Sequence, residues 1–235
     1  LRRGVMIEAL VDGDIFCYRA AFSCEDSSLE DAKDKLDDLL DYAISSVVWT
    51  LKGSEVKIFL TGKDNFRYDI AKTAPYKGNR KDVEKPRHLA GLRDHLISSW
   101  DAEVSEGEEA DDLIGIWATR VGPKVVVISV DKDMLQLPCV HYNPTKDTFT
   151  TVTEEEGLKF FYTQILTGDR ADNIMGLKGI GPVKAGKILE GCVTEAELLT
   201  AVVAAYDGDT DLVLENGRLL WLRREEGQLW ELPIV

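Results

Sequence analysis

The chain has 235 residues, of which 44% are hydrophobic and 30% are charged, and its formal net charge is −14. This length allows one large domain, or one domain with a smaller appendage. No apolar stretch approaches the ~20 residues that cross a bilayer, and the N-terminus meets acidic residues too early for a signal peptide. The composition excludes a membrane-spanning chain, predicts a cytoplasmic location and argues against indiscriminate nucleic-acid binding.

Short apolar runs alternate with helical patterns in the first part of the chain. The apolar, β-branched runs predict strands at 5–11, 55–61 and 124–130. The helical patterns lie at 29–51, 88–100 and 108–121. Strands that alternate with helices predict an α/β fold with a mostly parallel central sheet flanked by helices.

The character of the sequence changes after Asn143. A helix is predicted at 154–167, followed by glycine-rich helical turns to about Tyr206. The tail contains Asn216-Gly217, which is typical of a hairpin, but the same residues could continue as a helix. We therefore divide the chain into an α/β core (1–143) and a helical region with a C-terminal tail (144–235).

Acidic residues recur where the predicted strands end and where a helix begins. Asp12 follows the first strand and Asp131 the third, and ligands bind beyond the carboxyl ends of the strands in such sheets. Carboxylates gathered at one edge repel each other unless a cation lies between them, and oxygen-only ligation favours Mg²⁺ or Mn²⁺ over zinc. The candidate metal ligands are Asp12, Glu109, Asp111, Asp112, Asp131, Asp133, Asp169 and Asp172. The alternative is that these are helix caps and surface acids.

Two basic patches offer contacts to phosphate. The first is PYKGNRK, a predicted turn that concentrates Lys77, Arg80 and Lys81. Taken alone, such a stretch is usually a solvated loop. The second is GLKGIGPVKAGKIL, a predicted helix–hairpin–helix whose glycine amides could approach a phosphate. Its candidate DNA-binding residues are Lys178, Gly179, Gly181, Lys184 and Lys187.

The second patch nearly satisfies the P-loop pattern for nucleotide binding, GxxxxGK[ST]. The residue after Gly186-Lys187 is Ile188, which cannot bind magnesium, and no hydrophobic strand leads into the loop. ATP binding is therefore rejected.

Read in order, five segments resemble the successive motifs of the 5′ nuclease family. They are VDGDIFCYR, PYKGNRK, EGEEADDLIG, ISVDKDMLQL and TGDRADNIMGLKGIGPVKAGKIL. That family includes flap endonucleases, phage 5′→3′ exonucleases and the 5′-nuclease domain of bacterial DNA polymerase I. The resemblance implies a PIN-like core and hydrolysis of DNA near 5′ ends with two metal ions.

The resemblance also assigns roles to residues. It implies that the eight acids listed above hold the metals, with Asp131 counted among the catalytic residues. Lys77 and Arg80 would lie at the base of an arch near residues 72–95 and contact the scissile phosphate. Arg19 would lie near the same phosphates. A K⁺ ion held by main-chain carbonyls of the helix–hairpin–helix turn is a further implication.

The remaining side chains receive simpler interpretations. Tyr76 is the best candidate to stack on a base. Phe16 and Phe22 are assigned to the core. The expected positions of four polar side chains are a turn cap for Asp14, a solvent-facing site for Glu108 and a helix surface for His88 and His95. The four cysteines lack zinc-site spacing and are expected to be buried apolar side chains.

The leading interpretation is a monomeric enzyme that cuts duplex DNA at a 5′ end or a 5′ flap, with an RNA–DNA hybrid as a second possible substrate. A PIN-like ribonuclease shares the acidic edge, but such chains are usually shorter. A non-catalytic helix–hairpin–helix DNA-binding protein would have no use for the full set of acids, whose repulsion would cost stability.

Overall fold

The computed structural model describes residues 8–48, 55–80 and 83–233. At its centre is a six-stranded sheet with the strand order β3-β2-β1-β4-β5-β6. Neighbouring strands are parallel except for β6, which is antiparallel to β5. The strands are β1 (Glu8–Asp12), β2 (Glu55–Leu60), β3 (Glu103–Val104), β4 (Val125–Ile128), β5 (Val140–Asn143) and β6 (Thr148–Thr151). The predicted mostly parallel sheet is confirmed, and it extends past the predicted boundary at residue 143.

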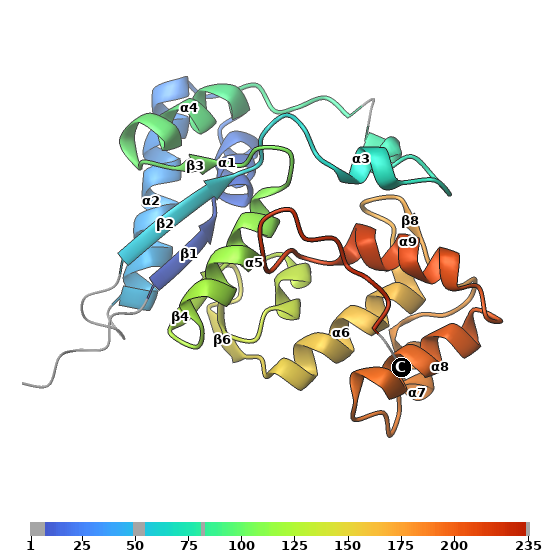
Figure 1. The fold of residues 1–235 in the computed structure, drawn as a ribbon. Helices are drawn as coiled ribbons and strands as arrows, with labels where there is room; N and C mark the ends of the chain where they lie inside the picture. Colours follow the sequence, from blue (N-terminus) through green and yellow to red (C-terminus); the bar gives the residue numbers. More distant parts are fainter. Residues whose placement is uncertain (1–7, 49–54, 81–82, 234–235) are drawn as a thin grey trace, which may run out of the picture.

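Helices cover both faces of this sheet (Figure 1). Ala9 and Val11 of β1 pack on the side of α1, α2 and α4, whereas Leu10 between them packs on the side of α5. Side chains on a strand alternate between its faces, so a strand buried on both sides reads as a continuous apolar run. These helices are α1 (Gly13–Ser23), α2 (Leu29–Val48), α4 (Leu89–Ser99) and α5 (Ala110–Val121).

The C-terminal helices form a second lobe with a core of their own (Figure 1). They are α6 (Glu154–Thr167), α7 (Pro182–Ile188), α8 (Glu195–Ala205) and α9 (Thr210–Leu220). Asn216 and Gly217 lie inside α9, so the tail continues as a helix and does not form a hairpin there. Gly217 is needed because Trp230 packs against it, and an added Cβ would lie 2.2 Å from the indole ring.

A short ribbon separates α6 from the glycine-rich turn. Its strands are β7 (Gly168–Asp169) and β8 (Ile174–Met175), which pair antiparallel. The glycine-rich turn therefore follows a ribbon and leads into α7, so the helix–hairpin–helix motif stays a prediction. Three short helices complete the described chain: α3 (Arg67–Ile70), η1 (Gly78–Arg80) and η2 (Lys132–Gln136). Within the described ranges, no helix is both long and apolar enough to cross a bilayer.

Candidate active site

Two adjacent strands carry the first acids to one edge of the sheet. Asp12 ends β1, and Asp131 lies just beyond the end of the neighbouring strand β4. The hydroxyl of Ser129 connects them, because it donates to Asp12 at 3.0 Å and accepts from the Asp131 backbone N–H at 3.0 Å. Burial, together with the neighbouring carboxylates of Asp14 and Asp131, raises the pKa of Asp12 to about 7.

The N-terminus of α5 brings further acids to this edge. Glu109 is the N-cap residue, and Asp111 lies in the first turn. Burial and the charges of Asp12 and Asp131 raise the pKa of Asp111 well above its ordinary value. Three acidic motifs far apart in the sequence are therefore close enough in space to repel each other.

A third group of acids comes from η2 and from the ribbon. Burial and the carboxylates of Asp131 and Asp169 raise the pKa of Asp133 to about 7, although Lys132 opposes the shift. The ammonium of Lys132 lies 3.6 Å from Asp169. Burial also raises the pKa of Asp172, against the opposing charge of Lys77. Asp133 therefore lies between the group around Asp131 and the acids of the ribbon.

The turn at residues 75–80, here called the basic turn, places its cations directly on these acids. Lys77 forms an ion pair with Glu109, and its ammonium lies 3.8 Å from Asp172. Although burial alone would lower the pKa of Lys77, the two carboxylates raise it. Arg80 donates to the other oxygen of Asp172 at 2.9 Å. Lys77 and Arg80 thus contact the acids directly, and their predicted position at the base of an arch, in contact with the scissile phosphate, stays a prediction.

Hydrogen bonds to backbone carbonyls attach the basic turn to residues 170–173, which join β7 to β8 and are here called the ribbon loop. The N–H of Lys77 donates to the carbonyl of Asp172 at 2.8 Å, and Lys77 has a φ of 51°. Asn79 donates to the carbonyl of Arg170 at 2.8 Å, and Asn173 donates to that of Pro75 at 2.9 Å. These contacts hold residues 75–79 and residues 170–173 together beside the acids.

Asp112 is predicted to be a metal ligand, but the structure commits its carboxylate to protein donors. Arg67 donates to both oxygens, at 2.6 and 2.9 Å, and the backbone N–H of Arg223 donates at 3.1 Å. The side chain is completely buried, and these partners lower its pKa against the effect of burial. The sequence EEADD does not distinguish the fully buried Asp112 from the half-buried Asp111.

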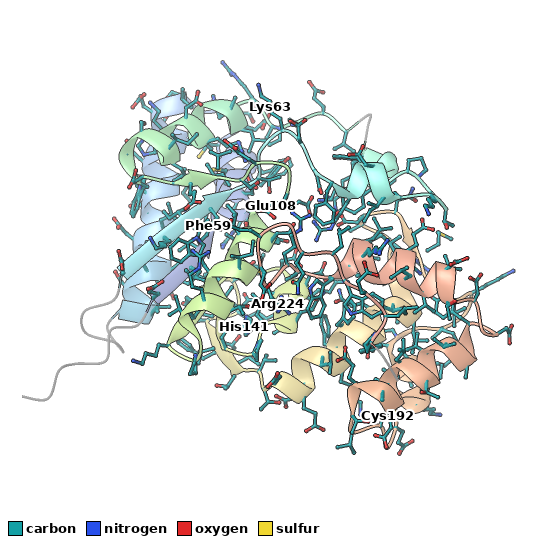
Figure 2. The ribbon with its side chains drawn as sticks, in the orientation of Figure 1. Phe59, Lys63, Glu108, His141, Cys192 and Arg224 are labelled. Carbon is teal, nitrogen blue, oxygen red and sulfur yellow. The ribbon has the colours of Figure 1, made fainter. Side chains whose placement is uncertain are left out.

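Glu108 is buried, and its predicted solvent-facing position is therefore wrong. Its carboxylate accepts from Arg223 at 2.8 Å, and the Arg223 guanidinium lies 3.7 Å from the ring centre of Phe66. Figure 2 shows Glu108 in the middle of the molecule, near the C-terminal segment that carries Arg224. Glu108 and Asp112 therefore attach the start of α5 to the C-terminal segment.

Tyr76 does not offer a stacking surface. Its side chain is only 3% exposed. The phenol lies 2.8 Å from an oxygen of Asp172 and 3.0 Å from one of Glu109. Tyr68 packs against its ring edge to face. A buried ring cannot stack on a nucleotide base, so the stacking assignment of Tyr76 is wrong and its role is to support the acids.

Three further expectations differ from the structure. Asp14 does not cap a turn: it pairs with Arg93 and accepts from the Thr61 backbone N–H at 2.8 Å. Phe16 is buried as expected, but Phe22 is 64% exposed and lies on the surface of α1. His88 is buried and bonded to a backbone carbonyl, whereas His95 is half-buried beside an aspartate.

The remaining candidate DNA-binding residues lie outside the basic turn, and five of them share the glycine-rich segment. Arg19 is a half-buried residue of α1, and Lys81 lies outside the described residues. Lys184 of α7 turns back to donate to the carbonyl of Gly179 at 2.8 Å. The candidates Lys178, Gly179, Lys184 and Lys187 are exposed, and Gly181 is the half-buried N-cap of α7. The structure brings the basic turn to the acids and leaves the glycine-rich segment as a separate surface.

The acids suit a hard divalent cation by donor chemistry, since all offer oxygen donors, and Asp12, Asp111 and Asp133 are repelled by neighbouring carboxylates. In their present rotamers, no three His, Cys, Asp or Glu side chains within the described ranges are placed so that they could hold one ion. Side-chain rotation would be needed to surround a metal. Burial and neighbouring carboxylates raise the pKa of Asp12 and of Asp133, and a cation between the acids would relieve their mutual repulsion.

Most of the chain matches the profile of one known protein family. The profile described as "5′-3′ exonuclease, N-terminal resolvase-like domain" matches residues 8–163. The chain belongs to this family. The match includes β1, the basic turn, α5 and η2, and it ends before the ribbon and the glycine-rich turn. The resemblance to 5′ nucleases predicted from the motifs is therefore confirmed.

Individual relatives match over shorter stretches. The flap endonuclease Xni of Vibrio campbellii (strain ATCC BAA-1116) is 34% identical over 173 residues, which cover 61% of this chain and 62% of the relative. DNA polymerase I of Rhizobium leguminosarum is 41% identical over 98 residues, covering 37% of this chain and 10% of the polymerase. The chain thus spans less than two thirds of the length of either relative.

Solved structures share the fold at low sequence identity. The T5 D15 protein co-crystallized with metal ions superimposes with a TM-score of 0.70 and 17% identity, covering 91% of this chain and 88% of that one. The catalytic core of Rad2 in complex with a DNA substrate gives a TM-score of 0.52 at 14% identity, covering 88% of this chain and 66% of that one. The fold class is therefore shared along nearly the whole chain.

Several side chains that support the site carry no sequence signal of their own. Four of them contact acidic side chains, and these are Arg67, Ser129, Gln164 and Arg223. The fifth, Gln136, contacts Gln164. Ser129 alone could have been suspected, because it lies between a strand and an acidic motif. The other four become recognisable only when the helices are packed together.

Proposed function

We propose that this chain hydrolyses DNA phosphodiesters at or near 5′ ends, as a 5′→3′ exonuclease or a flap endonuclease. The observation that carries the proposal is the convergence of acidic residues from β1, α5, η2 and the ribbon at one edge of the sheet, with Lys77 on two of them. Family membership supports the reaction class. Its relatives are described as flap endonucleases and DNA polymerase I.

Two divalent ions, Mg²⁺ or Mn²⁺, are part of the proposal. The ligands of the first would come from Asp12, Glu109, Asp111 and Asp131, and those of the second from Asp133, Asp169 and Asp172. When bound, the metals would supply an activated water and neutralise charge on the scissile phosphate. Asp112 is left out because its oxygens are bound by Arg67.

Lys77 and Arg80 would hold the scissile phosphate. In the structure both cations face carboxylates, Lys77 on Glu109 and Arg80 on Asp172. Once those carboxylates are neutralised, the same cations can turn to the phosphate and stabilise the negative charge that develops on it. The tight fixation of the basic turn to the ribbon loop would keep this movement small, so little free energy is lost in ordering the site.

The glycine-rich segment is proposed to hold the duplex part of the substrate. Lys178, Lys184 and Lys187 are exposed there and can neutralise backbone phosphates without reading sequence. The K⁺ ion implied for this turn remains a prediction. One carbonyl of the turn, that of Gly179, accepts from Lys184 in the structure.

The direct test is cleavage of a duplex with a 5′-labelled flap in the presence of Mg²⁺, Mn²⁺ or EDTA. We expect short 5′ products that depend on the metal, and their length separates exonuclease from flap cleavage. A parallel reaction with a single-stranded RNA examines the ribonuclease alternative. Tight DNA binding without cleavage under any metal would contradict the proposal and support a non-catalytic DNA-binding protein.

A further inference from the structure

Two buried glutamines connect Asp133 to the C-terminal segment. Gln164 of α6 donates from Nε2 to Oδ1 of Asp133 at 2.7 Å. The Oε1 of Gln164 accepts from Nε2 of Gln136 at 2.8 Å. Gln136 lies at the end of η2, the helix that also carries Asp133. The side chains of Gln164 and Gln136 are 4% and 2% exposed, so water does not compete for these bonds.

Two backbone groups determine the direction of each hydrogen bond between the C-terminal segment and Asp133. The N–H of Leu222 can only donate, and it donates to Oε1 of Gln136 at 3.2 Å. The carbonyl of Leu220 can only accept, and it accepts from Nε2 of Gln136 at 2.8 Å. Gln136 must therefore present its second N–H to Oε1 of Gln164, and Gln164 must present its N–H to Asp133.

The same C-terminal stretch holds the start of α5 through alternate residues. The carbonyls of Leu219 and Trp221 accept from Arg67 at 2.8 Å each, and Arg67 binds Asp112. Leu220 and Leu222 are therefore connected to Asp133 through the two glutamines. Leu219 and Trp221 are connected to Asp112 through Arg67. This stretch lies outside the family match, which ends at residue 163.

Close packing leaves the connection little freedom. Gly157 of α6 lies directly against the backbone of Gln136, where an added Cβ would be 2.5 Å from the carbonyl oxygen. Arg224 donates to the same carbonyl at 3.0 Å. Since α6, η2 and the C-terminal segment cannot separate without breaking these contacts, the donor on Asp133 is held in place.

We propose that Gln164, oriented by Gln136 and the backbone of Leu220 and Leu222, is a positioning residue for Asp133. Among the described side chains, one donor reaches Oδ1 of Asp133, and it restricts the rotation of the carboxylate while Oδ2 is left to bind a cation. This inference rests on the proposed function, because it assumes that Asp133 is a metal ligand. Groups that orient a ligand through hydrogen bonds typically change metal affinity or activity by about 10–100-fold when they are removed.

The test is Gln164→Met, which keeps the length and volume of the side chain but removes the donor. We expect the Mn²⁺ affinity of the DNA-free protein, measured by electron paramagnetic resonance, to fall by roughly 10–100-fold. The far-UV circular dichroism spectrum should be retained. In cleavage assays, the metal concentration at half-maximal rate should rise by a similar factor, and saturating metal should restore much of the rate.

Asn216→Leu is the matched control. Asn216 is also a buried amide, 2% exposed, and it donates to the carbonyl of Met175 at 2.9 Å and to Tyr206 at 3.1 Å. Its hydrogen bonds do not reach the acids. We expect Asn216→Leu to lower the melting temperature. Its Mn²⁺ affinity, measured well below that temperature, should equal that of the wild type.

The possible outcomes separate this inference from the proposed function. If the wild-type protein binds no Mn²⁺, the proposed function fails. If it binds Mn²⁺ and Gln164→Met binds equally well, the positioning role is wrong. Should Gln164→Met not fold, Gln164→Asn decides, because it keeps an amide but is one methylene too short to reach both Asp133 and Gln136. Unchanged Mn²⁺ affinity in folded Gln164→Asn would also overturn the inference.

Discussion

Arg67 binds Asp112 through both terminal nitrogens, at 2.6 and 2.9 Å, and each side chain is at most 2% exposed. A buried pair of this kind contributes little compared with an apolar pair, but removing one partner leaves an uncompensated buried charge. The pair therefore makes Asp112 a structural residue although it lies beside the candidate metal ligand Asp111.

Asp112→Asn tests this structural role. We expect the free energy of unfolding to fall by about 3–5 kcal/mol, because the Arg67 guanidinium loses its counter-charge. Chemical denaturation measures the loss, and Mn²⁺ titration of the folded variant should give the wild-type stoichiometry. Loss of one Mn²⁺ site with little change in stability would return Asp112 to the metal ligands.

Asp131→Ala is expected to abolish cleavage while duplex binding stays largely intact. Asp131 lies between Asp12 and Asp133, and its removal would take a carboxylate from the centre of the site. Gel-shift and cleavage assays on the same DNA measure the two properties separately. Glu190→Ala, which removes one exposed negative charge elsewhere, is the control. Metal-dependent turnover by Asp131→Ala would remove that residue from the mechanism.

Lys77→Ala should slow the chemical step by about 10²–10³-fold, since removing one group that stabilises developing charge typically has that effect. Single-turnover rates at saturating enzyme measure the change without a contribution from product release. Lys72→Ala removes an exposed lysine from the same segment and should leave the rate unchanged. Equal rates for Lys77→Ala and the wild type would show that Lys77 does not act in the chemical step.

Lys184→Ala should weaken duplex binding and reduce its salt dependence. One lost phosphate contact lowers the slope of log K against log salt by about 0.9. Fluorescence anisotropy at several KCl concentrations gives this slope. Lys146→Ala, on the exposed turn between β5 and β6, serves as the comparison. An unaltered slope in Lys184→Ala would mean that the glycine-rich segment does not hold the duplex.

The metal-free protein should lose stability between about pH 4 and pH 7. Asp12 and Asp133 have pKa values near 7 in the folded protein, raised from 3.8 by burial and neighbouring carboxylates. The folded state holds their protons more tightly than the unfolded state, so this stabilisation is complete below the unfolded pKa and is lost as pH rises through 7. Asp112, whose pKa is lowered, acts in the opposite direction only at more acidic pH.

Thermal unfolding in EDTA from pH 5 to pH 8 measures this effect. We expect the melting temperature to fall across the range, where each 1 kcal/mol corresponds to about 2–4 °C in a chain of this size. Adding Mn²⁺ should raise the melting temperature more at pH 8 than at pH 5. A flat metal-free profile would indicate that the acids are not in mutual repulsion.

The sequence by itself determined the features that depend on neighbouring residues. Burial on both faces of the sheet makes β1 and β4 nearly continuous apolar runs, and the acids that follow them must lie at the carboxyl edge of a parallel sheet. The start of α6 is predictable from the sequence because Thr153 and Glu156 form a capping box there. These signals lie within a few residues of the feature that they predict.

Only the tertiary structure decided which acids face the site and which hold the protein together. Asp112 differs from Asp111 through Arg67, 45 residues away, and Glu108 is buried by Arg223, 115 residues away. The burial of Tyr76 also depends on a distant segment, because its partner Asp172 lies 96 residues further along the chain. Burial and ion pairing depend on contacts between distant segments, and local patterns of charge and hydrophobicity do not contain that information.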